Sequence, residues 1–397
     1  MILKYLISRR TKAILFGFWD CFFPKNSSKI ILVIKDRTEF SGNLRVVSDI
    51  LLEEKIHQVF VYKDGKMVPE IKQTLEQKGA SVLEGWGLNS LYHLLTSGIF
   101  IFSHAPRDAH ITKRCKNRTI INLWHGVAFK TIENLMPNIP AQKQKQLKTN
   151  AELYDLVIAS SKLDQETNAK AFIVDMEKIK ITGLPRYELL KNEYPLDSFL
   201  TLQKEKLLND KKDKKLILYA PTFREKNISA IDQINSNEWQ KISDILKRFN
   251  AILAIRPHSY DTAIPSCLVH DSNFCWLPHT EFTETNLILQ HVDLLIVDFS
   301  SIWIDFLLLD RPIIGFAKDF EHYMHNERGF IYDFDRTFPS KFSQTVDDLC
   351  SELKYYLENN ILQEQYIKPK TMFHHYDLSA SYTQNLEKTM NALITNS

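Results

Sequence analysis

The stretch DLLIVDFSSIWIDFLLLDRPIIGF, residues 293–316, decides the fold class. Residues 293–297 are typical of a buried strand, residues 312–316 of a second one, and the apolar segment between them of a helix. A strand, a helix and a strand at this spacing predict a parallel βαβ unit. The polar turn at residues 298–301 then falls at the carboxyl end of a strand, where open α/β sheets bind ligands.

The turn itself allows two interpretations. Ser300 and Ser301 bring adjacent hydroxyls to the start of a helix. Backbone N–H groups point outward there and favour an anion such as phosphate. Alternatively, one of the two serines only caps the helix. The turn alone does not decide between an anion site and a simple helix cap. Polar residues at other strand ends favour the anion site.

The same alternation of strands and helices recurs along the chain in two series. We expect strands at residues 29–35, 57–62, 81–83, 98–103, 119–123 and 153–159, and again at 216–219, 251–255, 293–297 and 313–316; helices are expected at 42–52, 68–78 and 238–248. A lysine-rich segment at residues 197–215 separates the series and reads as a solvated helix face and linker. The chain is therefore predicted to be an α/β protein with two Rossmann-like domains that face each other across a cleft.

The predicted domain limits follow from this pattern. Residues 1–28 form an N-terminal helical segment, 29–200 the first domain and 201–378 the second, and 379–397 a last helix that packs back on the first domain. A length of 397 residues, 44% of them hydrophobic, suits two domains with sizeable cores.

Composition excludes several classes of protein. A formal net charge of +2 and the lack of a recognition motif give no case for nucleic-acid binding. The five cysteines are scattered without CxxC spacing, so we expect neither a disulfide framework nor a zinc site, and a reducing cytoplasm. The chain has no GxxxxGK[ST], GxGxxG or GxSxG motif. His104, His110, His374 and His375 form no convincing metal set and are interpreted as surface or packing residues.

The N-terminus mixes aromatic and basic residues. Trp19, Phe22 and Phe23 follow a cluster that includes Arg9 and Arg10, and no apolar run is long enough to span a bilayer. This combination favours an amphipathic helix in the membrane interface. The alternative is a helix docked on the protein's own core.

Polar residues follow three further strands. His125 and Gly126 come after one strand, and a histidine there accepts a proton at neutral pH or, alternatively, only makes a structural hydrogen bond. Thr222 and Arg224 follow another strand, and arginine makes bidentate contacts with phosphate oxygens. Arg256-Pro257-His258 follows the next one. Each of the two arginine groups could be a solvated surface loop, but together with the serine pair they are expected to converge on one edge of the second domain's sheet.

The segment of residues 319–330 is polar and rich in aromatic residues. We expect a loop, either over a sugar or nucleotide through Glu321 and Arg328 or simply on the surface.

The motifs taken together resemble those of the CDP-glycerol glycerophosphotransferase family, which includes teichoic-acid polymerases and primases and related capsule polymerases. The motifs are NLWHG at residues 122–126, TGLPR at 182–186, LYAPTFR at 218–224, RPH at 256–258, DFSS at 298–301, LDRPI at 309–313, EHY at 321–323 and RGF at 328–330. They occur in the family's order over residues 120–334.

The resemblance implies a GT-B fold and a peripheral enzyme on the cytoplasmic face of the cell membrane. It implies transfer of glycerol phosphate, or a related alditol phosphate, from CDP-glycerol or CDP-ribitol to an acceptor hydroxyl of a lipid-linked or glycan polymer, with release of CMP. Neither a metal nor another cofactor is implied, and the partners are the donor, the acceptor and the membrane surface.

The resemblance also implies roles for individual residues. The catalytic residues are His125, as the base, and His258; the substrate-binding residues are Gly126, Lys130, Pro185, Arg186, Thr222, Arg224, Arg256, Asp298, Ser300, Ser301, Glu321, Arg328 and Gly329. Arg224, Arg256, His258 and the two serines grip the donor pyrophosphate, and Asp298, Glu321 and Arg328 shape the donor pocket.

The chain departs from the family pattern on the acceptor side. Val127-Ala128-Phe129 replaces Thr-Pro-Leu after His-Gly, although Lys130 is kept, and the first 110 residues match only loosely. Two other functions therefore stay open: a GT-B glycosyltransferase that uses a nucleotide sugar, and a non-catalytic, membrane-bound, nucleotide-binding scaffold.

Overall fold

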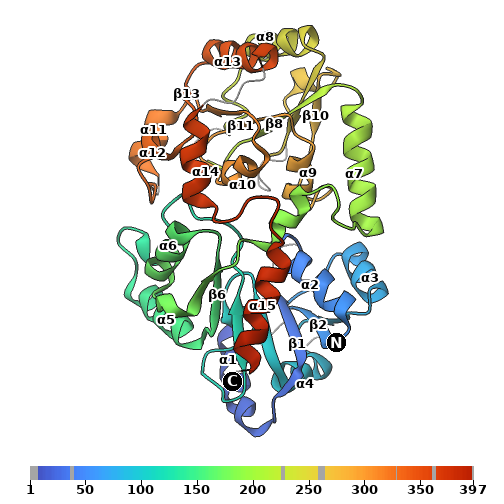
Figure 1. The fold of residues 1–397 in the computed structure, drawn as a ribbon, viewed down its shortest axis with the longest axis vertical. Coiled ribbons are helices and arrows are strands. Elements are labelled where there is room, and N and C mark those ends of the chain that lie inside the picture. Colours follow the sequence, from blue (N-terminus) through green and yellow to red (C-terminus); the bar gives the residue numbers. More distant parts are fainter. Residues whose placement is uncertain are drawn as a thin grey trace.

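Two parallel β-sheets, one in each half of the chain, organise the protein. The computed structural model describes residues 8–35, 40–224, 229–257, 264–327, 329–359 and 364–395. The N-terminal sheet lies in the lower lobe of Figure 1 and the C-terminal sheet in the upper lobe. The predicted α/β class is confirmed.

The N-terminal sheet has seven strands in the order β3-β2-β1-β4-β5-β6-β7. The elements of this half are α1 (Arg9–Trp19), β1 (Asn26–Ile34), α2 (Gly42–Glu54), β2 (Gln58–Lys63), α3 (Pro69–Gln77), β3 (Ser81–Glu84), α4 (Leu88–Thr96), β4 (Ser97–Phe102), β5 (Thr119–Asn122), α5 (Ala141–Leu153), β6 (Leu156–Ala159), α6 (Lys162–Phe172) and β7 (Ile179–Ile181). Alternate residues of β1 enter two different hydrophobic clusters, Ile30 and Leu32 one and Ile31 and Val33 the other. Both faces of the sheet are therefore covered, as expected for parallel strands.

The C-terminal sheet repeats the pattern with six strands in the order β10-β9-β8-β11-β12-β13. The elements of this half are α7 (Ser198–Lys211), β8 (Lys215–Ala220), α8 (Ser236–Arg248), β9 (Ala251–Ile255), β10 (Phe274–Trp276), α9 (Thr285–Gln290), β11 (Leu294–Val297), α10 (Ile302–Phe306), β12 (Ile313–Phe316), α11 (Phe320–Asn326), α12 (Phe334–Thr337), β13 (Phe342–Ser343), α13 (Val346–Asn359), α14 (Ile367–Phe373) and α15 (Tyr382–Thr395). In both sheets the strand order reverses beside the first strand, between β1 and β4 and between β8 and β11. Ligands of open α/β sheets bind at such reversals.

One expectation about secondary structure is wrong. Residues 320–326 form helix α11 and not a loop. Phe320 and Tyr323 lie three residues apart and pack on Phe299, with the rings of Phe299 and Tyr323 stacked at 3.7 Å between centroids. Aromatic side chains at helical spacing thus give the helix a buried face. The polar residues between them make this periodicity hard to recognise in the sequence.

The N-terminal helix α1 is docked on its own half of the protein. Phe16 is 1% exposed, and Asp20, just after the helix, accepts two hydrogen bonds from the buried Arg118 at 2.6 and 2.8 Å. Large apolar side chains nevertheless stay exposed at the end of the helix, among them Phe18 and Trp19, and in the turn after it, where Phe22 lies. Docking on the core and exposed apolar side chains therefore coexist in this segment.

The last helix, α15, crosses back onto the N-terminal half, where Figure 1 shows it in the lower lobe. Its Tyr382 ring lies against Gly183, and Glu188 accepts a hydrogen bond from the Thr383 backbone at 3.2 Å. Among the described residues of α1 to α15, no helix is long and apolar enough to cross a membrane.

The contact of Gly183 with Tyr382 predicts a stability effect. Gly183 has φ +71, and a Cβ there would lie 2.3 Å from Cδ1 of Tyr382. We expect Gly183→Ala to lower the free energy of unfolding by about 3 kcal/mol, since it adds steric overlap to backbone strain. Gly79→Ala is the matched control, because Gly79 has φ +96 but no neighbour within 4 Å; it should cost about 1 kcal/mol. Urea denaturation measures both, and equal losses would refute a role for the Tyr382 contact.

Candidate functional site

A cleft of about 520 Å³ lies between the two halves, at the carboxyl ends of their strands. The predicted site residues that line it are His125, Gly126, Lys130, Arg186, Thr222, Arg256, Ser300 and Ser301. The predicted residues His258 and Arg328 lie outside the described residues. The structure thus brings eight of the predicted residues to one cavity, from both halves of the chain.

Arg186 joins the two halves at the centre of the cleft. Its Nη2 donates to Oδ1 of Asp305 in α10 at 2.6 Å, and its Nη1 donates to the His125 carbonyl. Although burial opposes the charge, Asp305 raises the pKa of Arg186. Pro185 is itself buried and starts the short helical turn Pro185–Leu190 that presents Arg186. Gly126 has φ +151, and a Cβ there would lie 2.7 Å from Nη2 of Arg186. The glycine therefore gives the guanidinium room beside the histidine.

The Asp298–Ser301 turn is organised by Asp298, which is fully buried. Its carboxylate accepts from the Thr222 backbone at 2.8 Å, from the Thr222 hydroxyl at 2.7 Å and from the Ser300 backbone at 3.3 Å. Ser301 occupies the N-cap of α10 but its side chain makes no capping bond. Within the described chain, the hydroxyls of both serines are uncommitted, which favours the anion-site interpretation over simple capping.

Arg224, predicted to grip the donor pyrophosphate, lies behind the wall of the cleft and is paired with carboxylates. It is 3% exposed, and its guanidinium pairs with Asp298 at 2.8 Å and bidentately with Asp319 at 2.7 and 3.0 Å. Two carboxylates therefore neutralise this cation, and it does not line the cleft. Its position indicates that it holds the Thr222 loop and the Asp298 turn together.

Arg256 has the opposite environment. It is 3% exposed and donates to His279 Nδ1 at 3.0 Å and to Thr285 Oγ1 at 3.1 Å, but it forms no ion pair with any described residue. Burial lowers the pKa of Arg256 to about 10, and Glu284 opposes this shift only in part. A buried cation without a carboxylate partner, on the wall of a cleft that also holds free hydroxyls, is a site for an anion.

His125 faces this anion site from the N-terminal half. Its ring is exposed to the cleft and packs against Trp124, at 3.9 Å between centroids, and His104, at 4.5 Å with the planes 19° apart. The surrounding protein and then the Arg186 cation lower the pKa of His125, although water in the cleft moderates the desolvation of the exposed ring. The imidazole is therefore neutral at pH 7 and can accept a proton.

Besides Pro185, Arg224 and Asp298, two further predicted residues do not line the cleft. The Glu321 side chain is 70% exposed on α11, where it lies 3.7 Å from His325. Gly329 accepts a hydrogen bond from the Thr131 backbone at 3.1 Å, next to an antiparallel bridge between Lys130 and Phe330. Gly329 therefore contributes to contact between the halves, and Glu321 belongs to the solvent-facing side of its helix.

The sequence reasoning missed four residues of this region: His104, His279, Thr285 and Asp305. A signal existed for two of them. His104 follows β4, the hydrogen-bonded neighbour of β5, so its position beside His125 follows from strand order. Asp305 is a lone charge inside an apolar helix, and such a charge needs a partner. Among the described residues, no three His, Cys, Asp or Glu side chains are grouped so as to hold a metal ion.

Comparison with known proteins gives a consistent result. A family model described as CDP-Glycerol:Poly(glycerophosphate) glycerophosphotransferase matches residues 15–382. The chain is 30% identical over 358 residues to the teichoic acid poly(ribitol-phosphate) polymerase of Bacillus spizizenii, covering 87% of this chain and 54% of that protein. It is 28% identical over 344 residues to the teichoic acid poly(glycerol phosphate) polymerase of the same organism, covering 83% and 84%. The chain thus spans about half the length of the first relative.

Solved structures share the fold. The wall teichoic acid polymerase TagF superposes with a TM-score of 0.77 at 20% identity, over 98% of this chain and 94% of that one. Staphylococcus aureus MnaA, solved with UDP, gives a TM-score of 0.56 at 12% identity, over 92% and 95%. The two-domain, GT-B-like architecture expected from the motifs is confirmed.

The ion pair between Arg186 and Asp305 predicts a non-additive effect on stability. Asp305→Asn leaves a largely buried guanidinium without its counter-charge and should lower the free energy of unfolding by about 3 kcal/mol. Adding Arg186→Gln removes the second charge and should recover about half of the loss. Chemical denaturation of the single and double variants tests this.

The matched control for this cycle is the exposed pair of Arg248 and Glu358, 3.4 Å apart. Glu358→Gln should cost less than about 1 kcal/mol. Additive losses at positions 186 and 305 would contradict the proposed coupling.

Proposed function

The chain belongs to the CDP-glycerol:poly(glycerophosphate) glycerophosphotransferase family, and from this premise we propose that it transfers an alditol phosphate from CDP-glycerol or CDP-ribitol to an acceptor hydroxyl. The acceptor is a teichoic-acid-like or related surface glycan polymer, and CMP is released. The observation that carries the proposal is the buried Arg256, which has no carboxylate partner among the described residues and faces His125 across the cleft.

The donor pyrophosphate fits the C-terminal wall of the cleft. Arg256 supplies a desolvated positive charge, and the hydroxyls of Ser300 and Ser301 supply neutral donors beside it. Lys130 reaches the same wall from the other half, with Nζ 3.4 Å from Thr222 Oγ1. Preorganised donors of this kind stabilise the charge that develops on phosphate oxygens during transfer.

The reaction needs one proton transfer and one displacement. The neutral imidazole of His125 accepts the proton of the acceptor hydroxyl, whose oxygen attacks the phosphorus that bears the alditol. The bond from that phosphorus to the bridging oxygen breaks, and CMP leaves with the electron pair. Arg256 and the serine hydroxyls stabilise the leaving phosphate. Stacking on His104 and packing against the tilted Trp124 ring hold the His125 ring in one orientation.

Peripheral attachment to the cytoplasmic face of the membrane belongs to the same proposal. Phe18 and Trp19 at the end of α1 and Phe22 in the turn after it are 60%, 47% and 66% exposed, and the basic Arg9 and Arg10 stand at the start of the helix. Aromatic side chains enter the headgroup region of a bilayer, and basic residues contact anionic lipids. Such a surface would bring the cleft close to a lipid-linked acceptor.

The role of His125 as the base predicts that its substitution lowers turnover. Purified protein with CDP-glycerol or CDP-ribitol and a phosphorylated glycan acceptor should release CMP, and His125→Ala should reduce the rate about a thousandfold. His270→Ala, at an exposed histidine outside the cleft, should leave the rate unchanged. Turnover of a UDP- or GDP-sugar in place of either CDP-alditol would favour the glycosyltransferase alternative.

The pH dependence of kcat/KM is a second test of His125 as the base. The base form of a histidine is lost as the pH falls through its pKa, and the pKa of His125 is lowered from 6.5 by burial and by Arg186. The wild-type kcat/KM should therefore stay on its plateau at pH 6.5 and fall only at lower pH. Half-maximal activity at or above pH 6.5 would contradict the assignment of the base.

The exposed aromatic side chains at the end of α1 and in the turn after it predict that the protein binds membranes. Replacing Phe18, Trp19 and Phe22 by Ser should weaken co-sedimentation with anionic vesicles more than about tenfold, since each loses apolar burial. The core contacts of Phe16 and Asp20 are kept. The control replaces the exposed Leu88 and Tyr92 of α4 by Ser. Equal vesicle binding by both variants would refute the role of α1.

A further inference from the structure

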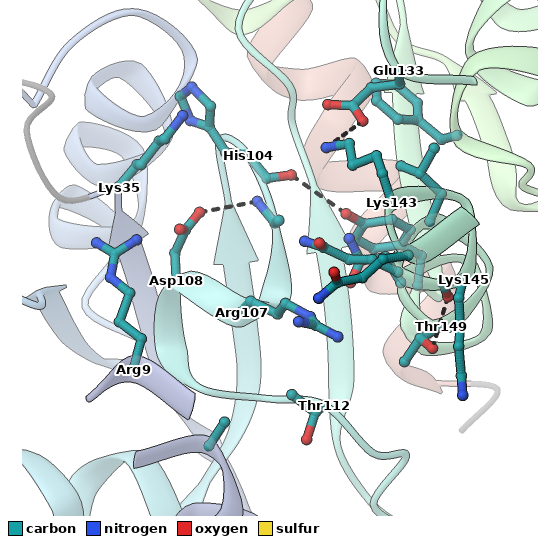
Figure 2. Close-up of a pocket in the computed structure, with 18 of the residues that line it drawn as sticks. Arg9, Lys35, His104, Arg107, Asp108, Thr112, Glu133, Lys143, Lys145 and Thr149 are labelled. Atoms are coloured by element: carbon teal, nitrogen blue, oxygen red, sulfur yellow. Dashed lines mark hydrogen bonds and ion pairs between the residues drawn. The ribbon is translucent and has the colours of Figure 1, made fainter. Parts of the chain in front are cut away.

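A second cavity, of about 1060 Å³, opens in the N-terminal half beside the cleft. It is bounded by α1, the helical turn Pro106–Ala109 and α5, and by the ends of β1, β4 and β5 (Figure 2). Trp124, His125 and Ile132 line both this cavity and the cleft. The two cavities therefore meet at His125, each from its own side.

The wall of this second cavity is strongly basic. Its cations are Arg9, Arg10, Lys35, Arg107, Lys143 and Lys145. Only two carboxylates share the wall, and both are engaged: Glu133 pairs with Lys143 at 2.7 Å, and Asp108 accepts from the Ala105 backbone at 3.2 Å. Figure 2 shows Arg9 and Lys35 on one side, Lys143 and Lys145 on the other and Arg107 between them. The cavity therefore carries positive charge on opposite walls.

Three of these cations make no ion pair or side-chain hydrogen bond with any described residue. Arg10, Arg107 and Lys145 are exposed, and their side chains make no hydrogen bond or ion pair within the described chain. A structural ion-pair network would have satisfied them with carboxylates. Uncommitted cations around a cavity of this size favour an anionic ligand with several charges.

The sheet topology points to the same cavity independently of charge. The strand order of the N-terminal sheet reverses between β1 and β4. Lys35 follows β1 and His104 follows β4, and both line this cavity. Ligands of open α/β sheets bind outside the strand ends at such a reversal. The cleft occupies the corresponding place in the C-terminal sheet, beside β8 and β11.

We propose that the basic cavity is an acceptor subsite that holds successive phosphodiester groups of a polyanionic acceptor strand. The terminal hydroxyl of the strand lies at His125, and the preceding phosphates lie along Arg107 and Lys145. The proposal rests on the proposed function, and it adds a specificity: the enzyme prefers acceptors that already carry several phosphates. Two separate cavities that meet at the base also let the donor be replaced while the strand stays bound.

The test removes two uncommitted cations. In Arg107→Gln/Lys145→Gln, the KM for an acceptor oligomer with several phosphates should rise about fivefold to tenfold, because two charged contacts are lost. The KM for a single-phosphate acceptor, the KM for the CDP-alditol and kcat should change less than about twofold. Added salt should raise the wild-type KM for the oligomer towards that of the variant.

The matched control is Lys116→Gln/Lys148→Gln, which removes two exposed lysines of the same half that do not line the cavity. It should leave the KM for the oligomer unchanged. An unchanged KM in the cavity variant, or an equal rise for both acceptors, would overturn the proposal.

A vesicle-binding experiment distinguishes an acceptor-phosphate site from a site for lipid headgroups. Sedimentation with phosphatidylglycerol vesicles should be equal for the cavity variant and the wild type. Loss of vesicle binding with an unchanged KM for the soluble oligomer would assign the cavity to lipid and overturn the proposal. If wild-type protein releases no CMP, the proposed function fails, while the affinity of a fluorescent oligomer for the two variants still decides whether the cavity binds phosphodiesters.

Discussion

The ion pair of Arg186 with Asp305 is the interaction on which the geometry of the cleft depends. One guanidinium contacts the backbone of His125 in the N-terminal half and the side chain of Asp305 in the C-terminal half. Two further links run in parallel: the Glu284 carboxylate accepts from the Gly42 backbone at 3.0 Å, and the Phe129 carbonyl accepts from the Ile331 backbone at 2.9 Å. These bonds fix the distance between the histidine and the anion site, and catalysis by positioning depends on that distance.

Charge compensation distinguishes the two arginines at the ends of neighbouring strands. Arg224 and Arg256 both follow strands of the C-terminal sheet, Arg224 four residues after the end of β8 and Arg256 directly after β9. Two carboxylates neutralise Arg224, whereas Arg256 contacts only neutral groups. Asp319, the second partner of Arg224, comes from beyond β12, so a long-range contact decides which arginine stays available. A strand-end pattern in the sequence does not contain that information.

The sequence predicted the fold well because the buried strands are continuous apolar runs. Residues 251–255 and 313–316 are strands at the predicted bounds, and the alternation with helices led to two sheets. The prediction of a loop where α11 forms was wrong for a physical reason. The aromatic residues of this segment pack on Phe299, which is remote in sequence. The members of the site were largely predictable from strand ends and family motifs. The stack of His104 on His125 and the partners of Arg224 were not, because they depend on which loops meet in space.

The return of α15 to the N-terminal half constrains how the two lobes can move. The chain passes between the lobes twice, once between Leu190 and α7 and again between α14 and α15. The two crossings touch, since Lys191 Nζ donates to the Ala380 carbonyl at 2.6 Å. Two lobes joined by linkers that lie side by side share one hinge region. Any opening of the lobes is therefore hinged at these two crossings, and the bonds that Arg186 makes across the cleft oppose it.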